Sequence, residues 1–287
     1  MIIDAHQHFW DLETGNYDWM TGAAMAPIRR NFGPDDLQPL MAEAGVDKTI
    51  LVQCRHDFEE TRDFLAIAAN RDFVVGVVGW VDLQADDVAE KIAALRALPG
   101  GEHLVGIRHI VHDEPDAAWL LRPAVQRGIA AVIEAGLTFD LLARTRELAA
   151  ATALAKAFPK GRFVLDHLAK PPIASGSSEA WQAEFEKISA LDNVWCKISG
   201  MVTEADWTGW RPADFDTYAG LALDLFGPDR IIFGSDWPVC TLAAGYKEVN
   251  AIAHRLVDIN PGIAERFYHL NAVAAYELGD LKTGTSL

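Results

Sequence analysis

The chain opens with the stretch Met1-Ile2-Ile3-Asp4-Ala5-His6-Gln7-His8, in which an apolar start leads into two histidines separated by one residue. In a β-strand, side chains two positions apart point to the same face. His6 and His8 are therefore expected to project together from the C-terminal end of a strand. Two adjacent imidazoles suit a metal ion or the carbonyl oxygen of a substrate. The alternative is a structural pair whose ring nitrogens bond to backbone carbonyl groups.

Seven further runs rich in apolar and β-branched residues follow, at 47–54, 73–82, 104–111, 137–142, 162–168, 193–199 and 230–236. Such nearly continuous runs are typical of strands that are buried on both faces. Helical periodicity fills the intervals, at 35–44, 59–70, 85–98, 116–135, 144–158, 178–191, 213–226, 247–259 and 262–277, with a break expected at Arg122-Pro123. This alternation predicts an α/β fold, a (β/α)8 TIM barrel, with residues 1–287 as a single domain. The tail 283–287 is expected to be disordered.

The composition agrees with one large core and argues against several classes of protein. Half of the residues are hydrophobic, yet no uninterrupted apolar run approaches the ~20 residues of a membrane span. The net charge of −16 argues against a nucleic-acid partner, which requires clustered lysine and arginine. The three cysteines, Cys54, Cys196 and Cys240, are too far apart for a CxxC zinc site and predict no disulfide framework. No secretion signal is evident, so we expect a cytoplasmic protein with no membrane partner; a homo-oligomer remains open.

The residues that end the predicted strands would share one pocket, because barrel enzymes build their active sites at that end. Asp236 follows the apolar run Ile231-Ile232-Phe233 and precedes Pro238, so its carboxylate would face the imidazoles and could take a proton from water. His167 is its expected partner. By strand alternation Asp166 would point to the opposite side. Lys170 could reach the pocket from its loop or be surface charge, and surface charge is the favoured interpretation. The strand ends also carry Arg55, His56, Trp80, Arg108, His109, Asp140 and Lys197.

Two long insertions, 9–34 and 200–212, follow predicted strands and are rich in tryptophan. Aromatic rings in such loops can form the walls of a pocket for a sugar-like ring. The alternative is that they plug the mouth of the barrel. The expected substrate contacts are Trp19, Met20, Arg29, Arg55, Trp80, His109, Met201 and Trp207.

Three motifs resemble the amidohydrolase superfamily: Asp4-Ala5-His6-Gln7-His8, Leu165-Asp166-His167 and Gly234-Ser235-Asp236-Trp237-Pro238. The continuation His8-Phe9-Trp10-Asp11 and the strand end Gly106-Ile107-Arg108 resemble more closely its branch of sugar-lactone and pyrone-dicarboxylate lactonases. The resemblance spans nearly the whole chain. It implies a (β/α)8 barrel with the site at the C-terminal ends of the strands.

The sequence departs from the binuclear members of that superfamily, which carry a bridging lysine or glutamate at the fourth strand and a histidine at the fifth. Here the fourth strand ends in Arg108-His109 and the fifth offers Asp140. The resemblance therefore implies at most one metal ion, with zinc as the expected cofactor. Its ligands would be His6, His8, His167 and Asp236. The lactonase branch also includes members that work without metal, so zinc is not expected to be essential.

The expected activity is hydrolysis of the ring ester of a sugar-acid lactone, with L-fuconolactone-type aldonolactones as the favoured substrates. Asp236 would activate water, and His6, His8 and His167, together with Arg108 or zinc, would stabilise the oxyanion. A different substrate class is an anionic lactone of the pyrone-dicarboxylate or sulfomuconolactone type, which would need arginine clamps. Arginines at positions 29, 30, 55 and 108 could supply these clamps. A zinc-dependent decarboxylase of the same superfamily and a non-catalytic sugar-binding barrel also remain open. The tryptophan-rich loops favour a neutral polyol ring.

Overall fold

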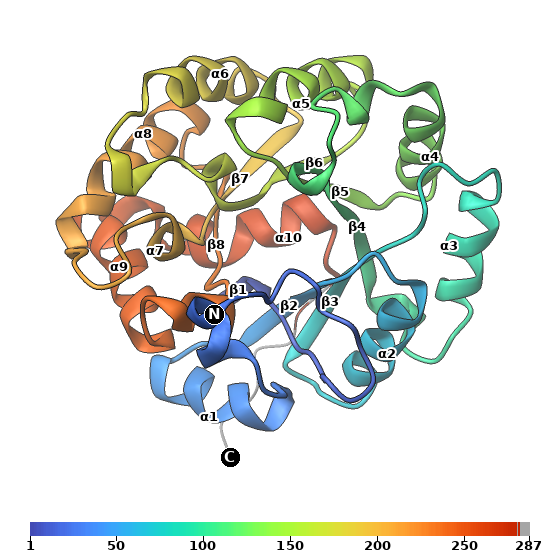
Figure 1. Cartoon of the computed structure of the whole chain (residues 1–287), viewed down its shortest axis with the longest axis horizontal. Coiled ribbons are helices and arrows are strands. Elements are labelled where there is room, and N and C mark those ends of the chain that lie inside the picture. The colour runs from blue at the N-terminus through green and yellow to red at the C-terminus, as the bar shows by residue number, and fades with distance from the viewer. Residues whose placement is uncertain (280, 282–287) are drawn as a thin grey trace.

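A computed structural model describes residues 1–279 and 281, and in it eight parallel strands form one sheet in the order β1 to β8 (Figure 1). The strands are β1 (Ile3–Gln7), β2 (Lys48–Val52), β3 (Val74–Gly79), β4 (Leu104–Ile110), β5 (Thr138–Leu142), β6 (Phe163–Leu165), β7 (Val194–Ile198) and β8 (Ile231–Phe233). The predicted (β/α)8 barrel is confirmed. The tail predicted at 283–287 lies outside the described residues.

The sheet curves until the segment after β8 lies beside β1. The amide of Asp236 donates to the His6 carbonyl at 2.8 Å, and the amide of His8 donates to the Trp237 carbonyl at 2.7 Å. Gly234 is required at this seam, because a Cβ there would lie 2.8 Å from the His6 Cβ. The close approach brings the predicted carboxylate and the predicted histidines to the same end of the barrel.

Helices surround the barrel at nearly the predicted positions. They are α1 (Pro34–Ala44), α2 (Phe58–Ala68), α3 (Val88–Arg96), α4 (Pro123–Glu134), α5 (Thr145–Ala157), α6 (Glu179–Ser189), α8 (Asp216–Phe226), α9 (Tyr246–Ile259) and α10 (Asn271–Tyr276). The break expected at Arg122-Pro123 is confirmed, since a 3-10 turn, η4 (Trp119–Leu121), ends just before α4. Among the described residues, no helix has the length and apolar character needed to cross a membrane.

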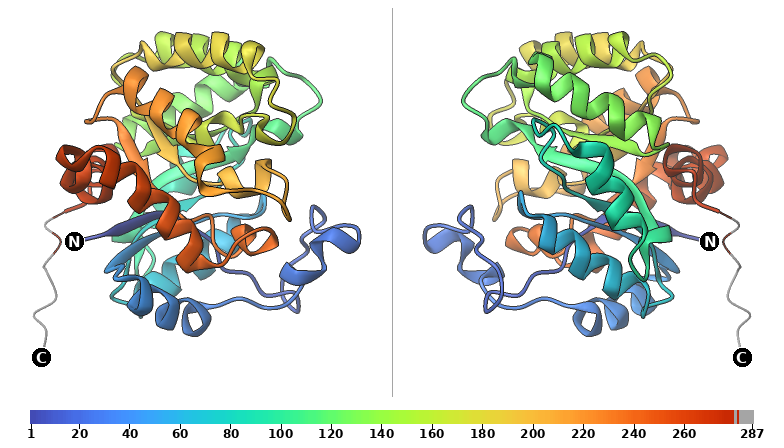
Figure 2. Two further views of the ribbon diagram at one scale, coloured as in Figure 1. Left: turned by 90° about the vertical axis from the view of Figure 1, so that its left-hand side faces the viewer. Right: turned by 90° about the vertical axis from the view of Figure 1, so that its right-hand side faces the viewer.

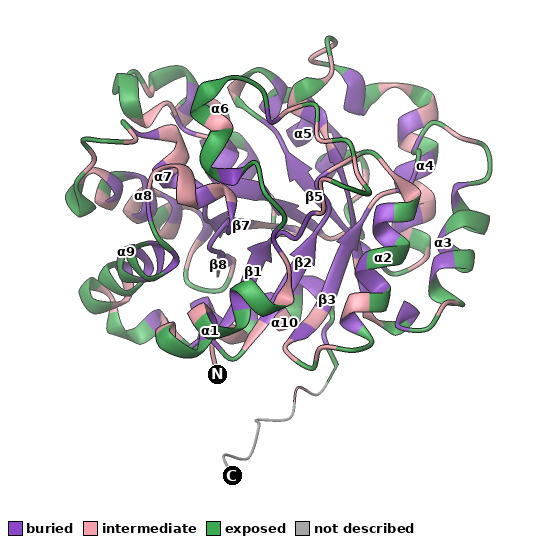
Figure 3. Ribbon diagram, turned by 60° about the horizontal axis from the view of Figure 1, so that its bottom comes forward, coloured by how far each residue is buried: buried purple, intermediate pink, exposed green. Residues whose placement is uncertain are grey.

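The helices pack one apolar face onto the strands and leave the other face to solvent (Figure 3). In α4, for example, Val125, Ile129 and Val132 have no exposed surface, and their spacing of four and three residues places them on one side of the helix. Burial of each such side chain contributes about 1.5–3 kcal/mol. Most strand residues are buried inside this shell, which accounts for their nearly continuous apolar sequences.

The two ends of the barrel differ. Helix α10 closes the N-terminal ends of the strands, where Thr138 donates to the Ala275 carbonyl at 2.6 Å and Asn271 donates to the Ile231 carbonyl at 2.7 Å. Figure 2 shows the long segment after β1, which includes the 3-10 helix η1 (Ala23–Ile28), on the opposite side from α10. The short helix α7 (Met201–Glu204) follows β7. The C-terminal end is therefore covered by loops, which can shape a pocket.

Candidate active site

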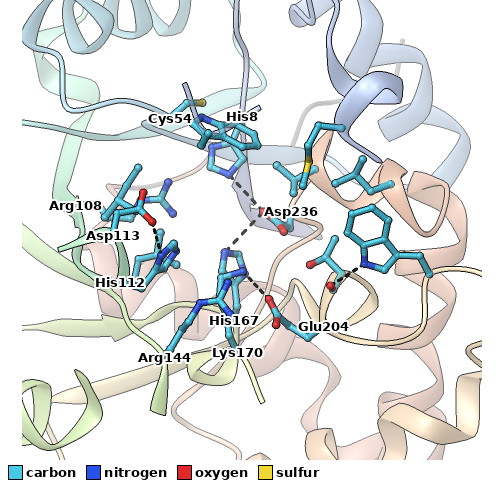
Figure 4. Close-up of a pocket in the computed structure, with 18 residues that line it drawn as sticks. His8, Cys54, Arg108, His112, Asp113, Arg144, His167, Lys170, Glu204 and Asp236 are labelled. Carbon is cyan, nitrogen blue, oxygen red and sulfur yellow. Dashed lines mark hydrogen bonds and ion pairs between the residues drawn. The ribbon is translucent and has the colours of Figure 1, made fainter. Parts of the chain in front are cut away.

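Three imidazoles and one carboxylate meet at the C-terminal end of the barrel. The Nε2 atoms of His8, His167 and His6 lie 3.4, 3.7 and 3.9 Å from Oδ1 of Asp236. His6 of β1 and His8, which directly follows this strand, project together as predicted, with their Nε2 atoms 3.2 Å apart. All four side chains are at least 94% buried. The sequence prediction thus found a real cluster, and Figure 4 shows Asp236 between His8 and His167.

Unusual backbone conformations present the two residues that come from other strands. Asp236 has a positive φ of 59°, and its neighbour Ser235 is held by Asp4, whose carboxylate accepts from the Ser235 amide at 2.8 Å and from its hydroxyl at 2.6 Å. His167 begins a left-handed turn that runs to Lys170, with φ between 52° and 55° at all four residues. Non-glycine residues rarely adopt this conformation, which persists where the surrounding structure enforces it and is common at functional sites.

The left-handed turn overturns two predictions. Because β6 ends at Leu165, the alternation of strand side chains no longer applies to Asp166, and this residue does not point away from the site. Its Oδ1 lies 3.3 Å from Nδ1 of His6, and Oδ2 accepts from Arg108 at 2.9 Å. The same turn brings Lys170 to the wall of the cavity above Asp236, so Lys170 is not simply surface charge.

A fully buried ionic layer lies under the imidazoles. The ammonium of Lys197 contacts Asp140 at 2.7 Å, Asp166 at 3.0 Å and Nδ1 of His6 at 3.1 Å, and Tyr276 of α10 donates to Asp140 at 2.7 Å. Burial opposes ionisation of Asp166, but Lys197, His6 and Arg108 outweigh burial and hold its pKa well below the usual value. The layer therefore fixes the position of His6 from below.

The protonation states favour a carboxylate among neutral imidazoles. Burial lowers the pKa of His6 and of His167 well below 6.5, so both rings are neutral near pH 7. Burial alone would raise the pKa of Asp236, but His167, His8 and the charge of Lys170 outweigh it and lower the pKa. Asp236 is therefore ionised and can accept a proton from a water molecule beside it.

Three of these groups, His6, His167 and Asp236, offer ligand atoms that all lie within 4.8 Å of one another and could hold a single zinc ion, while His8, the fourth predicted ligand, lies beside them but outside that group. The Nδ1–H of His8 donates to the Val52 carbonyl at 2.7 Å, which leaves the Nε2 lone pair directed at the cluster. Nδ1 of His167 similarly contacts the Ser199 hydroxyl at 2.8 Å. Three imidazole nitrogens and a carboxylate oxygen are a suitable donor set for Zn²⁺. The Arg108 guanidinium, 3.1 Å from Nε2 of His6, cannot ligate a cation and would repel a second one.

A cavity of about 260 Å³ opens above the cluster. The walls include two of the predicted substrate contacts, Trp19 and Trp207. Trp10, by contrast, is buried and donates to the Arg30 carbonyl at 2.8 Å, so it supports the loop. The tryptophan-rich loops therefore have two roles: Trp19 and Trp207 form part of the cavity wall, while Trp10 is packed inside its own loop.

Other predicted substrate contacts are placed elsewhere. Arg55 lines an adjoining cavity of about 320 Å³ that shares Trp19 and Cys54 with the first. Met20 and Met201 are buried in the packed core, and Arg29 donates to the Met20 carbonyl at 3.2 Å. None of these four residues is among those that line the cavity above Asp236.

Trp80 and His109 belong to a stacked column beside the site rather than to the wall of its cavity. The His109 ring stacks at 3.8 Å on His56 and at 4.0 Å on Trp119. The Trp80 indole donates to Nδ1 of His109 at 3.2 Å, and Nε2 of His109 contacts Glu114 at 2.8 Å. Because both ring nitrogens have protein partners, His109 supports the wall formed by the loop after β4.

Sequence reasoning missed several cavity residues, which are Met25, Cys54, His112, Asp113, Arg144, Lys170 and Glu204. Most follow strands β4 to β7 by several residues. Their common signal is a position just beyond a strand end, but many loop residues that do not face the cavity share that position.

Comparisons with known proteins agree with this geometry. The amidohydrolase family model matches residues 3–278. The chain belongs to the amidohydrolase family. This amidohydrolase is 42% identical over 251 residues to an L-fucono-1,5-lactonase from Burkholderia ambifaria, with 87% of this chain and 84% of that protein covered. It is 38% identical over 274 residues to an L-fucono-1,5-lactonase from Burkholderia multivorans, with 92% and 91% covered.

Solved structures agree as well. A crystal structure of an amidohydrolase from Burkholderia multivorans with bound zinc superposes with a TM-score of 0.91 at 36% identity, and covers 97% of this chain and 100% of that one. In the present amidohydrolase, His6, His167 and Asp236 offer ligand atoms within 4.8 Å of one another. A metal site in this family therefore fits the residues found here.

Proposed function

We propose that this amidohydrolase is a lactonase that opens the ring ester of a sugar-acid lactone, with an L-fuconolactone-like aldonolactone as substrate. The observation that carries the proposal is an ionised Asp236 against three imidazoles on the floor of a cavity, in a chain 42% identical to an L-fucono-1,5-lactonase. An ester is hydrolysed by attack of activated water on its carbonyl carbon, and a positioned carboxylate is a suitable base.

In the proposed reaction, Asp236 takes a proton from water while the oxygen of that water bonds to the lactone carbonyl carbon. The negative charge that develops on the carbonyl oxygen is stabilised by Arg108 and by an N–H of His6 or His167, whereas His8, which directs a lone pair at the cluster, could serve there only as a metal ligand. The bond from the carbonyl carbon to the ring oxygen then breaks, and Asp236 returns the proton to that oxygen. The product is a hydroxy acid, which ionises to a carboxylate and releases one proton.

A single zinc ion would be held by His6, His8, His167 and Asp236, and when bound it would polarise the carbonyl as a Lewis acid. We propose that activity does not depend on zinc entirely, because His6 can carry its proton on either nitrogen. Nδ1 faces the donor Lys197 and the acceptor Asp166. Nε2 faces the donor Arg108 and the lone pair of His8. Each nitrogen thus has one donor and one acceptor, so His6 can ligate a metal or donate to the substrate.

The charges that line the cavity favour a neutral substrate. Arg108, Arg144 and Lys170 contribute three positive charges, and Asp113, Glu204 and Asp236 contribute three negative ones, so they balance. Of the arginines at positions 29, 30, 55 and 108, only Arg108 lines this cavity, and it is engaged by Asp166 and the Gln53 carbonyl. A dianionic lactone would need free clamps.

The test is a screen of aldonolactones with a pH indicator that follows acid release, performed on the wild type and on Asp236→Asn. The substitution keeps the shape of the side chain and removes the base. We expect the wild type to hydrolyse L-fuconolactone and the variant to lose about 10²–10⁴-fold in kcat, the usual contribution of a general base. A variant that keeps more than about a tenth of wild-type kcat would show that Asp236 is not the base.

A further inference from the structure

A second charged pair faces the cavity: the charge of its lysine helps to lower the pKa of Asp236, but the reaction described above gives the pair no contact with the substrate. The Lys170 ammonium donates to Oε1 of Glu204 at 2.9 Å, and the two side chains are only 13% and 15% exposed. Both line the same cavity as Asp236. Figure 4 shows Lys170 and Glu204 together on the side of His167, close to Asp236. The pair is therefore within reach of a substrate whose carbonyl lies at the imidazoles.

Both members of the pair are placed by backbone that contacts His167. Lys170 ends the left-handed turn that His167 begins, and the Lys170 amide donates to the His167 carbonyl at 2.7 Å. Glu204 ends α7, whose preceding residue, Gly200, packs against the His167 ring. Each left-handed residue with a Cβ costs free energy, and four follow one another here. A surface ion pair contributes at most about 1 kcal/mol, so it could not offset that cost. The arrangement instead places the pair at a fixed position relative to the reacting centre.

The pair has hydrogen-bonding capacity to spare on the cavity side. An ammonium has three N–H donors and a carboxylate has two acceptor oxygens. Within the described part of the chain, the contact with Glu204 is the only side-chain hydrogen bond of Lys170, and Oε2 of Glu204 has no side-chain partner. Donors and an acceptor side by side match two adjacent hydroxyl groups, because each hydroxyl both donates and accepts.

We propose that Lys170 and Glu204 bind two neighbouring ring hydroxyls of the lactone and thereby select polyhydroxylated lactones over simple ones. This inference rests on the proposed lactonase function. In this arrangement the pair binds ring hydroxyls and not the reacting carbonyl, so Lys170 and Glu204 are substrate-binding residues rather than catalytic ones. A site built to bond hydroxyl groups discriminates strongly against a ligand that lacks them, since its partly buried polar groups are then left unpaired.

The experiment compares L-fuconolactone with δ-valerolactone, a lactone ring without hydroxyl groups. The variants are Lys170→Met, which keeps the length of the side chain, and Glu204→Gln, which keeps its shape. Lys187→Met is the matched control, because Lys187 forms an exposed ion pair with Glu184 at 2.6 Å on α6, away from the cavity. Steady-state kinetics are combined with calorimetric binding of both lactones in an Asp236→Asn background, so that binding is measured without turnover.

For Lys170→Met we expect about a 10- to 100-fold loss in kcat/KM and in affinity for L-fuconolactone, the range for one lost hydrogen bond to a charged group. The loss should lie mainly in KM. Glu204→Gln should lose less, because the amide still has one acceptor. Glu204→Gln should change kcat/KM for δ-valerolactone by less than about threefold, and Lys187→Met should resemble the wild type on both lactones. Lys170→Met also removes a charge that lowers the pKa of Asp236, so its loss on δ-valerolactone should be measurable but smaller than its loss on L-fuconolactone.

Three results would overturn the inference: equal losses on both lactones, no loss on either, or a wild type that does not prefer the hydroxylated lactone. Equal losses would mean that the pair only tethers α7 to the turn after β6. Failure of the proposed function gives a different result. In that case the wild type turns over neither lactone, while binding of L-fuconolactone in the Asp236→Asn background still depends on Lys170. If L-fuconolactone does not bind at all in that background, the inference fails as well.

Discussion

Replacement of Gly200 by alanine tests whether the position of His167 controls the reaction. Gly200 has φ 63° and ψ 9°, a left-handed conformation. An added Cβ would lie 2.7 Å from Nδ1 and 2.8 Å from Cγ of His167. His167 is 97% buried, and its Nδ1 contacts the Ser199 hydroxyl at 2.8 Å. The ring must therefore shift and weaken this contact in order to accept the new methyl group.

Two costs add in this variant. The left-handed conformation costs about 1–2 kcal/mol for a residue with a Cβ. Overpacking against a buried ring adds about 1–3 kcal/mol. We expect the free energy of unfolding to fall by about 2–5 kcal/mol in total. A displacement of the ring by about 1 Å should also lower kcat by about 10²-fold, because catalysis depends on the alignment of the reacting groups.

Gly45→Ala is the matched control. Gly45 is also left-handed, with φ 69° and ψ 24°, but no heavy atom lies within 4 Å of a Cβ built there. This variant should lose only the backbone cost of about 1–2 kcal/mol and keep wild-type kcat. Urea unfolding and lactone hydrolysis, measured on both variants, separate the two contributions. If Gly200→Ala and Gly45→Ala have the same kcat, the position of the His167 ring does not limit the reaction.

Three further outcomes are expected. Purified protein should bind no more than one zinc per chain, and chelation should reduce activity without abolishing it; two metals per chain, or complete loss that zinc restores, would contradict the role given to Arg108. The kcat/KM for neutral aldonolactones should exceed that for a pyrone dicarboxylate, because the cavity charges balance and the chain carries a net charge of −16. Burial and the neighbouring His109 lower the pKa of His56 to about 4. The unfolded chain binds this proton near pH 6.5, so below that pH the free energy of unfolding of the wild type should fall toward pH 4. Urea unfolding at about pH 7.5 and about pH 5 measures this fall, which should be smaller for His56→Gln than for the wild type. Equal falls in the two proteins would refute the lowered pKa of His56.

Much of the candidate site could be predicted because its residues lie at or just beyond the C-terminal ends of regular strands. His6 lies on β1 and His8 directly follows it, so the alternation of strand side chains predicts one face for both, and their Nε2 atoms lie 3.2 Å apart. The barrel followed from eight apolar runs with helical segments between them, and that topology gathers the strand ends at one place. The structure thus brings His6, His8, His167, Arg108 and Asp236 together, while their catalytic roles stay predictions.

The remaining contacts could not be predicted because they depend on backbone that leaves the regular pattern. Asp166 was placed on the wrong side because β6 ends one residue before it. Trp80 and His109 were expected to face substrate, but their rings stack sideways with His56 and Trp119. A strand pattern says which residues reach the end of the barrel. It does not say how each side chain turns once the strand has ended.

The sequence by itself determined the barrel, its order of strands and the histidine pair, because these follow from short-range periodicity and from the rules of parallel β/α connections. Only the tertiary structure decided which charged residues face the cavity. The left-handed turn from His167 to Lys170 and the positive φ of Asp236 are held in place by groups distant in the sequence, among them Asp4 and Trp181, whose indole donates to the Leu168 carbonyl at 2.8 Å. Local preference disfavours these conformations, so packing and hydrogen bonds between distant segments must impose them.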